Sequence, residues 1–343
     1  MKKVLALLLA LMMLAALVGC GQSGAKKEEE KSFSFTLGTT SAADDLQTKA
    51  LERFAANVKE KTDGKIDITV YPASMLGDAN AEMEAMIAGT QDMFMESEAG
   101  YLDAYGVHEA AAMGVATTAT PSQAKTLAES AYMASLRDKF RELNGVVTIS
   151  YNWYRNPIVI ASTKKLEKVE DFQGVKLRVV PSEITIKTYG ALGFKCTSIS
   201  YNEVYLSLSQ GVVDATICPF DGYYTMKFYE VAPYCLYFGS NTWMNLWMNE
   251  AKYNQLSDSQ KAIFKECAEE AGVWYTNEAA AARQPYIDAC EAAGCQFIDV
   301  SDEMLQECID LMAVVSYEQE DAGVIPKGSY DKMIAASLGQ DVS

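Results

Sequence analysis

Apolar positions after residue 32 recur at strand and helix spacing in turn along the chain. Residues 33–39 alternate as a strand does, and Leu46, Ala50, Phe54 and Val58 share one face of a helix predicted over 44–61. The same pattern predicts strands over 66–70, 92–95, 146–151, 158–162, 175–180 and 212–217, and helices over 83–87, 122–143, 182–191, 202–210, 221–230, 257–283 and 302–317. Strands that alternate with helices predict an α/β fold with mainly parallel sheets.

The chain is long enough for two lobes. About 312 residues follow the N-terminal region, which is too many for one ordinary core. Extended segments near 152–156 and 236–248 are predicted to cross between the lobes, so that residues 32–153 and about 241–280 form lobe I. Residues 154–240 and about 281–340 form lobe II. Two lobes joined in this way can hinge, and the cleft between them is the expected ligand site.

The N-terminus predicts an extracytoplasmic, lipid-anchored protein. Lys2 and Lys3 precede an apolar run of 16 residues, 4–19, which is too short to span a bilayer comfortably and is followed at once by Cys20. This arrangement is typical of a lipoprotein signal peptide over 1–19, with Cys20 as the lipidation site. Residues 20–31 are polar and low in complexity, as expected of a flexible tether to the membrane surface.

The net charge of the chain limits the classes of ligand that it can attract. Without Lys2 and Lys3, the chain has 27 basic against 46 acidic side chains, a net charge of −19. Such a surface repels nucleic acid and anionic lipid, so neither is expected as a ligand. Any attraction for a small anion must therefore be local.

The sequence contains few residues or motifs suited to catalysis or to metal binding. His108 is the only histidine, and the cysteines lack zinc-site spacing. Nucleotide-binding and nucleophile motifs are missing as well. We expect no enzyme activity, no metal and no cofactor, with the seven cysteines beyond Cys20 mostly free and buried and one disulfide possible.

Arg178 is the most informative residue of the chain. It lies on the predicted buried strand 175–180, where a charge without a partner is costly. The strand by itself favours an internal aspartate or glutamate as the partner. The alternative is a carboxylate supplied by a ligand, which the planar guanidinium fork matches.

Several segments resemble, in the same order, the solute-binding proteins of tripartite ATP-independent periplasmic (TRAP) transporters, the DctP family. Residues 171–179 are similar to the family's DLKGLKIRV segment, and residues 202–214 to its SEVYTALQQGVVDG segment. The other similar segments are 71–77, 83–86, 189–193 and 227–231. The resemblance covers the chain from about residue 33 to 320.

The resemblance implies a two-lobed, periplasmic-binding-protein-like (Venus flytrap) fold with a hinged inter-lobe cleft. It also implies a receptor that closes on a small organic acid and delivers it to a membrane permease driven by an ion gradient. In this family the strand arginine, here Arg178, pairs with the ligand carboxylate. Arg155 is the only candidate for a second family arginine, and either a ligand contact or a structural ion pair is open to it.

Departures from the family pattern bear on the ligand. Where relatives carry GQENPL, this chain has residues 215–220 with Cys218 in place of the asparagine and Phe220 after the proline. A thiol is a weak hydrogen-bonding group, and Trp153 and Trp243 lie near the predicted crossovers. Together these residues suggest a less polar pocket, suited to an aromatic or branched organic acid.

Glu96 and Ser97 complete the expected site. The carboxylates Glu96 and Glu98 follow the predicted strand 92–95 at the edge where α/β sheets bind ligands. A carboxylate there would repel a diacid and attract an amine, whereas the alternative is a solvated loop. Two other functions remain open at this stage. One is a sensor subunit that presents the same monomeric fold to a membrane kinase or chemoreceptor, and the other is a surface enzyme.

Overall fold

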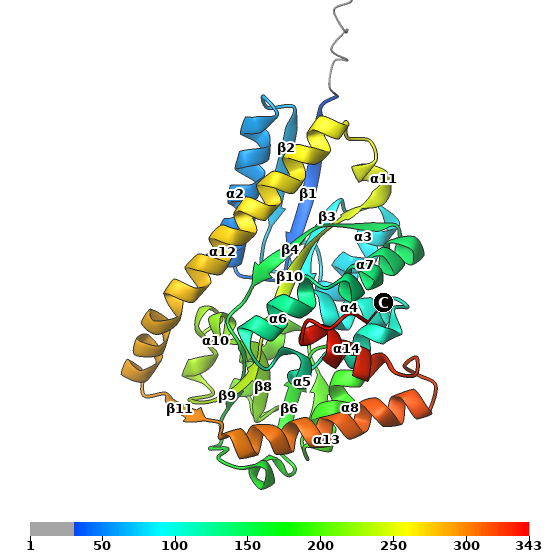
Figure 1. Ribbon diagram of the computed structural model, residues 1–343. Coiled ribbons are helices and arrows are strands. Elements are labelled where there is room, and N and C mark those ends of the chain that lie inside the picture. Colours follow the sequence, from blue (N-terminus) through cyan, green and yellow to red (C-terminus); the bar gives the residue numbers. More distant parts are fainter. Residues whose placement is uncertain (1–30, 343) are drawn as a thin grey trace, which may run out of the picture. The chain divides into compact units, whose positions relative to one another are not determined.

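Two separate sheets organise the protein (Figure 1). The computed structural model describes residues 31–342. The predicted signal peptide, Cys20 and all but the last residue of the predicted tether lie outside this range. No helix within it combines the length and the apolar character that a membrane crossing requires.

The first sheet has five strands. Their order is β2 (Ile66–Tyr71), β1 (Phe33–Thr39), β3 (Met93–Ser97), β10 (Trp243–Asn249) and β4 (Val146–Tyr154). Strands β1, β2 and β3 are parallel, whereas β10 is antiparallel to both of its neighbours. β10 returns from the second half of the chain to the middle of this sheet, as the apolar segment 236–248 predicted.

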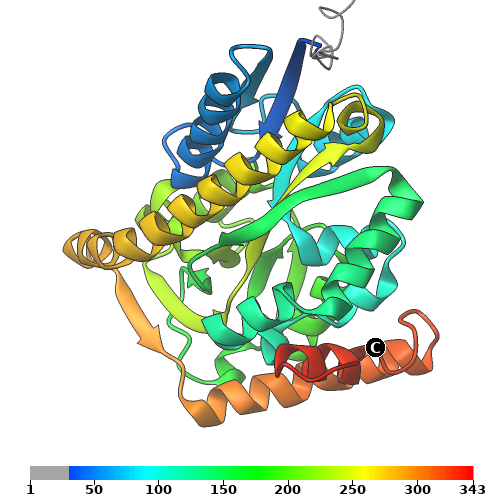
Figure 2. The same cartoon turned by 45° about the horizontal axis from the view of Figure 1, so that its top comes forward.

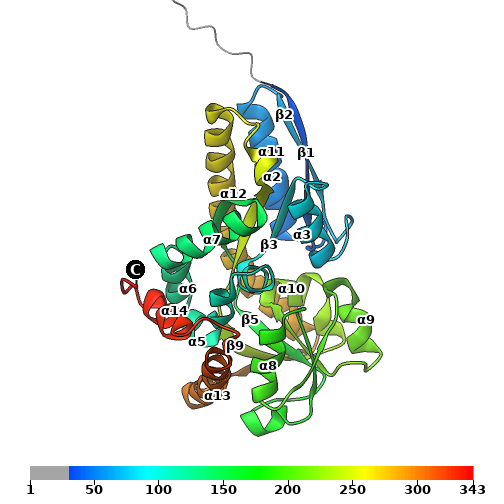
Figure 3. The ribbon, with the colours of Figure 1, turned by 90° about the vertical axis from the view of Figure 1, so that its right-hand side faces the viewer.

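The second sheet has six strands. Their order is β11 (Gln296–Asp299), β9 (Tyr234–Ser240), β5 (Ile158–Ser162), β8 (Ala215–Pro219), β6 (Lys176–Val179) and β7 (Lys195–Ser198). Only β5 runs against its neighbours β8 and β9. The α/β class with mainly parallel, two-lobed architecture is therefore confirmed. In Figure 3 the first sheet with α2 lies above the second sheet with α8 and α9.

Helices cover both faces of each sheet. The α-helices are α2 (Leu46–Lys61), α3 (Ala79–Ala88), α4 (Glu98–Ala104), α5 (Val115–Thr118), α6 (Pro121–Ala128), α7 (Ala131–Asn144), α8 (Glu183–Ala191), α9 (Val204–Ser209), α10 (Phe220–Thr225), α11 (Glu250–Tyr253), α12 (Asp258–Ala292), α13 (Asp302–Asp321) and α14 (Ser329–Ser337). Four apolar clusters result, one on each face of each sheet. In β10, for example, Met244 and Leu246 face one cluster while Trp243 and Trp247 face the other, as strand alternation requires.

Two short connections and one long helix link the sheets. One connection joins β4 to β5 and the other joins β9 to β10. A hydrogen bond holds them side by side, in which the Arg155 backbone N–H donates to the Thr242 carbonyl at 3.0 Å. Helix α12 packs on α2 and β4 near its start and on α10 farther along, and Figures 1 and 2 show it running past both sheets. Ser257 caps it, with Gln260 closing the capping box.

Helix α12 is longer than the pattern predicted. It continues beyond residue 283 through Pro285 to Ala292. A proline inside a helix removes one backbone hydrogen bond. Tyr286, Ile287 and Cys290 nevertheless pack against the second sheet, and this burial holds the last turns in place.

Other predicted elements differ at their ends. The helix expected over 122–143 is two helices, α6 and α7, because Ser130 caps α7 by accepting from the Met133 N–H at 3.1 Å. The helix expected over 221–230 stops at Thr225, since Lys227 adopts a left-handed backbone conformation with φ of 57°. The strand expected over 212–217 begins only at Ala215, after a turn at Gly211 with φ of 69°.

The last helix packs with the first sheet. Tyr330, Met333 and Ala336 of α14 belong to the cluster that contains Phe94 and Trp247. The predicted division assigned 281–340 to lobe II, and that boundary remains a proposal.

A buried ion pair stabilises the first sheet. Glu98, 1% exposed, accepts two hydrogen bonds from Arg137, one from Trp243 Nε1 at 2.7 Å and one from Asn245 Nδ2 at 2.7 Å. The Arg137 guanidinium also lies over the Tyr151 ring, 3.9 Å from its centre. The carboxylate is thus fully satisfied inside the lobe and is not available to a ligand.

We predict that Glu98→Gln lowers the free energy of unfolding by about 3–5 kcal/mol, because it leaves the Arg137 guanidinium buried without a counter-ion. Urea unfolding measures the loss. Glu109→Gln is the control, since its partner Lys139 is 41% exposed and such pairs contribute about 1 kcal/mol or less. Equal, small losses in both variants would contradict the assignment.

Candidate functional site

Polar and charged side chains from both sheets meet at one place. We call them the inter-sheet cluster, and its members are Asp45, Glu96, Arg155, Arg178, Tyr201, Cys218 and Asp221. Each affects the pKa of at least one other member. Asp45 precedes α2 of the first sheet, and its Oδ2 accepts from Thr225 Oγ1 of α10 at 3.0 Å. The cluster therefore lies where elements of the two sheets come into contact.

Parallel strands explain why these residues converge. Glu96 is near the carboxyl end of β3, Arg178 near that of β6 and Cys218 near that of β8. In α/β sheets, ligands bind outside the carboxyl ends of the strands. The structure thus brings together Arg178, Arg155, Cys218 and Glu96, all of which the sequence indicated.

Arg178 is a buried cation without an acidic partner. Its side chain is 2% exposed, and Nε donates to the Ile199 carbonyl at 2.8 Å. The guanidinium lies over the Tyr201 ring, 5.5 Å from its centre. Within residues 31–342, no carboxylate lies within 4.0 Å of it.

Burial lowers the pKa of Arg178, and Tyr201, Cys218 and Glu96 oppose that change. A guanidinium nevertheless keeps its proton in proteins. The internal partner that the strand alone favoured is not there. The Arg178 charge is therefore stabilised by one carbonyl hydrogen bond, the Tyr201 ring and the Glu96 carboxylate, which lies beyond 4.0 Å.

Arg155 has a partner but is incompletely bonded. Its Nη2 lies 3.9 Å from Asp221 Oδ2, and Nη1 donates to Met244 Sδ at 3.3 Å. Nε is buried without a hydrogen-bond partner. Burial acts to lower the pKa of Arg155, but the Asp221 carboxylate acts in the opposite direction. The pKa of Arg155 is therefore raised above its ordinary value. Arg155 thus forms an ion pair with Asp221 and, among the described residues, keeps Nε as an unused donor.

Two buried aspartates face this one arginine. Asp221 is 1% exposed; its Oδ2 accepts from Tyr275 Oη at 3.1 Å, while Oδ1 has no hydrogen-bond partner. Asp45 caps α2 by accepting from the Gln47 N–H at 2.8 Å. Burial and the Asp221 charge raise the pKa of Asp45 to about 6. Most Asp45 side chains are therefore ionised at neutral pH.

Cys218 and Tyr201 form the less polar part of the cluster. Burial raises the pKa of the Cys218 thiol, although Arg178 and Arg155 act in the opposite direction. Such a thiol is protonated and a weak hydrogen-bonding group. The Tyr201 hydroxyl is buried without a partner and lies against the backbone of Gly222, where an added Cβ would come within 2.1 Å.

Glu96 and Ser97 end strand β3 on the first-sheet side. Glu96 is half-buried; Oε2 accepts from Thr40 Oγ1 at 3.1 Å and Oε1 from the Ser97 N–H at 2.8 Å. Its carboxylate contributes to the raised pKa of Arg155 and opposes the lowering of the Arg178 pKa by burial. Ser97 is the residue before α4 and makes no side-chain cap.

Three predicted site residues lie in apolar cores instead. Trp153 packs on Tyr275 and donates to Ser150 Oγ at 2.7 Å. Trp243 belongs to the first-sheet cluster around Glu98, and Phe220 packs among aromatic rings of the second lobe. None of these three side chains adds a polar group to the inter-sheet cluster, although Phe220 packs in the same apolar cluster as Cys218, with Tyr201 against it.

Sequence reasoning missed Asp221, Asp45 and Tyr201. A signal existed for Asp221, which directly follows the carboxyl end of β8. Asp45 is recognisable only as a helix cap. Tyr201 lies outside regular strands, and its stacking on Arg178 depends on the pairing of β6 with β7.

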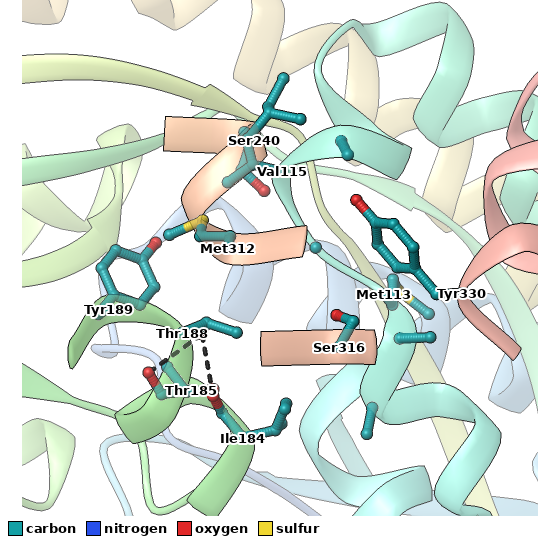
Figure 4. A pocket seen from close by; sticks show the side chains of 15 residues that line it. Met113, Val115, Ile184, Thr185, Thr188, Tyr189, Ser240, Met312, Ser316 and Tyr330 are labelled. Carbon is teal, nitrogen blue, oxygen red and sulfur yellow. Dashed lines mark hydrogen bonds between the residues drawn. The ribbon is translucent and has the colours of Figure 1, made fainter. Parts of the chain in front are cut away.

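A cavity of about 110 Å³ lies elsewhere (Figure 4). Thr185 and Thr188 of α8, Met312 and Ser316 of α13, and Tyr330 contribute to its wall. It lies over the face of the second sheet that Leu177 and Val179 cover, whereas Arg178 points to the opposite face. No predicted site residue lines it. Among the described residues, no group of acidic, histidine or cysteine side chains could hold a metal ion.

Comparison with known proteins gives one consistent family. Residues 37–321 match the family described as bacterial extracellular solute-binding protein, family 7. The sialic acid-binding periplasmic protein of Vibrio cholerae is 25% identical over 242 residues, which cover 70% of this chain and 74% of that protein. The 2,3-diketo-L-gulonate-binding periplasmic protein of Escherichia coli is 26% identical over 271 residues, which cover 77% and 80%.

Solved structures show the same fold. The sugar acid binding protein of Advenella mimigardefordensis in complex with galactonate superimposes with a TM-score of 0.83 at 20% identity, over 90% of this chain and 99% of that one. A TRAP periplasmic solute-binding protein of Desulfovibrio salexigens with bound orotic acid gives a TM-score of 0.81 at 21% identity, over 90% and 98%.

The buried Asp45 carboxyl generates a pH prediction. Its pKa is raised from 3.8 to about 6, so the folded state binds this proton more tightly than the unfolded state. Wild-type stability should therefore fall relative to Asp45→Asn as pH rises from about 4 to 7, by about 1–3 kcal/mol, and then stay constant. Asparagine retains the helix cap. Unfolding titrations of both proteins measure the difference, and parallel pH profiles would contradict the prediction.

Proposed function

Because the chain belongs to the bacterial extracellular solute-binding proteins of family 7, we infer that Arg178 is the residue through which it holds a small organic acid. The protein is an extracytoplasmic solute-binding receptor of the TRAP type. Family membership favours this function over the sensor alternative. The ligand and the roles of individual residues are our proposals.

One observation carries the assignment of Arg178. The guanidinium is 2% exposed, and no carboxylate within residues 31–342 neutralises it. A ligand carboxylate would supply the missing counter-ion and accept from Nη1 and Nη2, the two nitrogens that face it as a fork. Each charge-assisted hydrogen bond contributes about 1.5–3 kcal/mol, so this contact can dominate the affinity.

Ligand binding would couple to closure of the two lobes. Arg178 belongs to the second sheet and Glu96 to the first, while the Asp45–Thr225 hydrogen bond joins elements of both. A ligand drives closure only if it binds the closed state more tightly. We propose that the TRAP permease recognises the closed receptor, and that closure contracts the protein in small-angle scattering.

The nature of the acid is also a proposal. Relatives named for sialic acid and 2,3-diketo-L-gulonate, and fold relatives solved with galactonate or orotic acid, suggest a polar carboxylate. The aromatic or branched acid suggested by the sequence loses the support of Trp153 and Trp243, which lie in the cores. Cys218 and the Tyr201 ring still supply an apolar surface beside Arg178.

The remaining attributes follow from the sequence. We propose that Cys20 carries a lipid that anchors a monomeric receptor at the outer face of the cell membrane. We also propose that the protein has no catalytic activity: the single histidine, His108, is exposed and pairs with Asp103 at 3.0 Å, away from the inter-sheet cluster.

Arg178→Lys keeps the charge and loses the planar fork, so we expect the dissociation constant to rise at least tenfold. The probe is whichever of galactonate, glucuronate, succinate, malate and phenylacetate raises the melting temperature most, and calorimetry measures its affinity. Arg53→Lys is the matched control, because Arg53 is an exposed arginine that lies over the Trp274 ring. An unchanged affinity in a folded Arg178→Lys protein would remove Arg178 from the site.

A further inference from the structure

Carboxylates outnumber guanidiniums in the inter-sheet cluster. Asp45, Glu96 and Asp221 accompany Arg155 and Arg178. A second carboxylate on the ligand would enter a region that already has excess negative charge. A site built only for an acid would not gain from these three groups.

Asp221 is the carboxylate with unused capacity. Its Oδ1 is buried and has no hydrogen-bond partner, although the residue is 1% exposed. Arg155 does not satisfy it, since the closest approach is Nη2 to Oδ2 at 3.9 Å, beyond hydrogen-bond distance. A buried carboxylate oxygen without a hydrogen-bond donor is costly unless a ligand supplies one.

The charge near Asp221 is also unbalanced. Asp45 receives its hydrogen bonds from neutral groups, the Gln47 N–H and Thr225 Oγ1. Two buried carboxylates therefore share one guanidinium, that of Arg155. The other titratable groups that interact with Asp45 or Asp221 are four tyrosines and one cysteine, and burial raises the pKa of each: Tyr201, Tyr237, Tyr275, Tyr286 and Cys218. A neutral hydroxyl could satisfy Oδ1, but only a cation could balance the charge.

Tyr201 places this negative end close to Arg178. The Tyr201 ring lies under the guanidinium, and its hydroxyl lies against Gly222, the neighbour of Asp221 in the chain. One tyrosine side chain thus separates the Arg178 cation, which has no carboxylate within 4.0 Å among residues 31–342, from the Asp221 carboxylate, whose Oδ1 has no hydrogen-bond partner there. A small molecule with opposite charges at its two ends fits this arrangement.

We propose that the ligand is a zwitterion, whose carboxylate binds Arg178 and whose ammonium group binds Asp221. This inference rests on the proposed function and adds the second recognition element. An ammonium has three donors, which suits the free oxygen of Asp221 together with the Tyr201 hydroxyl. An amino acid is the class of substrate that meets both requirements.

The test compares ligands that differ only in the proposed group. The panel contains α-amino acids, such as leucine and phenylalanine, with the corresponding 2-hydroxy acids, and ω-amino acids with the unsubstituted acids. Succinate, malate and galactonate complete it. Thermal shift ranks the compounds and calorimetry gives affinities; we expect the best amino acid to bind at least tenfold more tightly than its hydroxy or unsubstituted partner.

Substitutions test which residue causes the preference for the amino compound. Asp221→Asn should reduce the preference for the amino compound by at least tenfold and change the affinity of its neutral partner by less than threefold. Arg178→Lys should weaken both compounds. Asp321→Asn is the control for loss of one negative charge, because Asp321 is 73% exposed at the end of α13 and is not a member of the cluster. If Asp221→Asn does not fold, Asp45→Asn serves as the second variant, with a smaller loss of preference in the same direction.

The outcomes separate the two proposals. Tighter binding of a hydroxy acid, dicarboxylate or sugar acid than of every amino acid would overturn the zwitterion and leave the carboxylate site at Arg178 intact. An amino preference that survives in Asp221→Asn would overturn the role of Asp221. A panel in which no carboxylate raises the melting temperature would contradict the proposed function itself.

Discussion

A guanidinium that cannot release its proton lies almost fully buried on β6, and no carboxylate of residues 31–342 neutralises it. Within the protein, the Arg178 guanidinium makes one hydrogen bond to a carbonyl and lies over one aromatic ring. These contacts offset only part of the free-energy cost of removing the charge from water. Arg137 shows the opposite solution in the same chain. It is also buried, yet Glu98 accepts two hydrogen bonds from it. The contrast separates a structural arginine from one that is available to a partner.

The two-sheet architecture makes such a site possible. The carboxyl ends of β3, β6 and β8 bring charged side chains to one place, and the connections between the sheets are short enough to keep both sheets there. Arg155 comes from one connection, and Asp221 from the helix after β8. Opposite charges that each remain incompletely bonded are costly in a finished core. They are useful where a ligand of matching charge completes them.

The aromatic side chains inside the lobes stabilise the apolar cores. Trp153, Trp243 and Phe220 fill apolar clusters, and the tryptophan N–H groups donate to Ser150 and Glu98. The two tryptophans lie near the predicted crossovers in the sequence, but their side chains pack into the apolar cores. A strand side chain points to one of two faces, and the pairing register decides which one. The cluster therefore contains Tyr201 as its aromatic ring and not the tryptophans.

The sequence by itself determined the α/β class, most strands, the apolar face of α2 and the arginine on a buried strand, because each depends on local periodicity or on a single chemical anomaly. Tertiary packing decided the rest: that α12 continues through Pro285, that the helix expected over 122–143 breaks at Ser130, and that Arg178 has no acidic partner among residues 31–342. It also decided that Asp45 and Asp221, 176 residues apart in the numbering, share one arginine. No local pattern contains such a pairing, since it arises only when the ends of two distant strands are folded against each other.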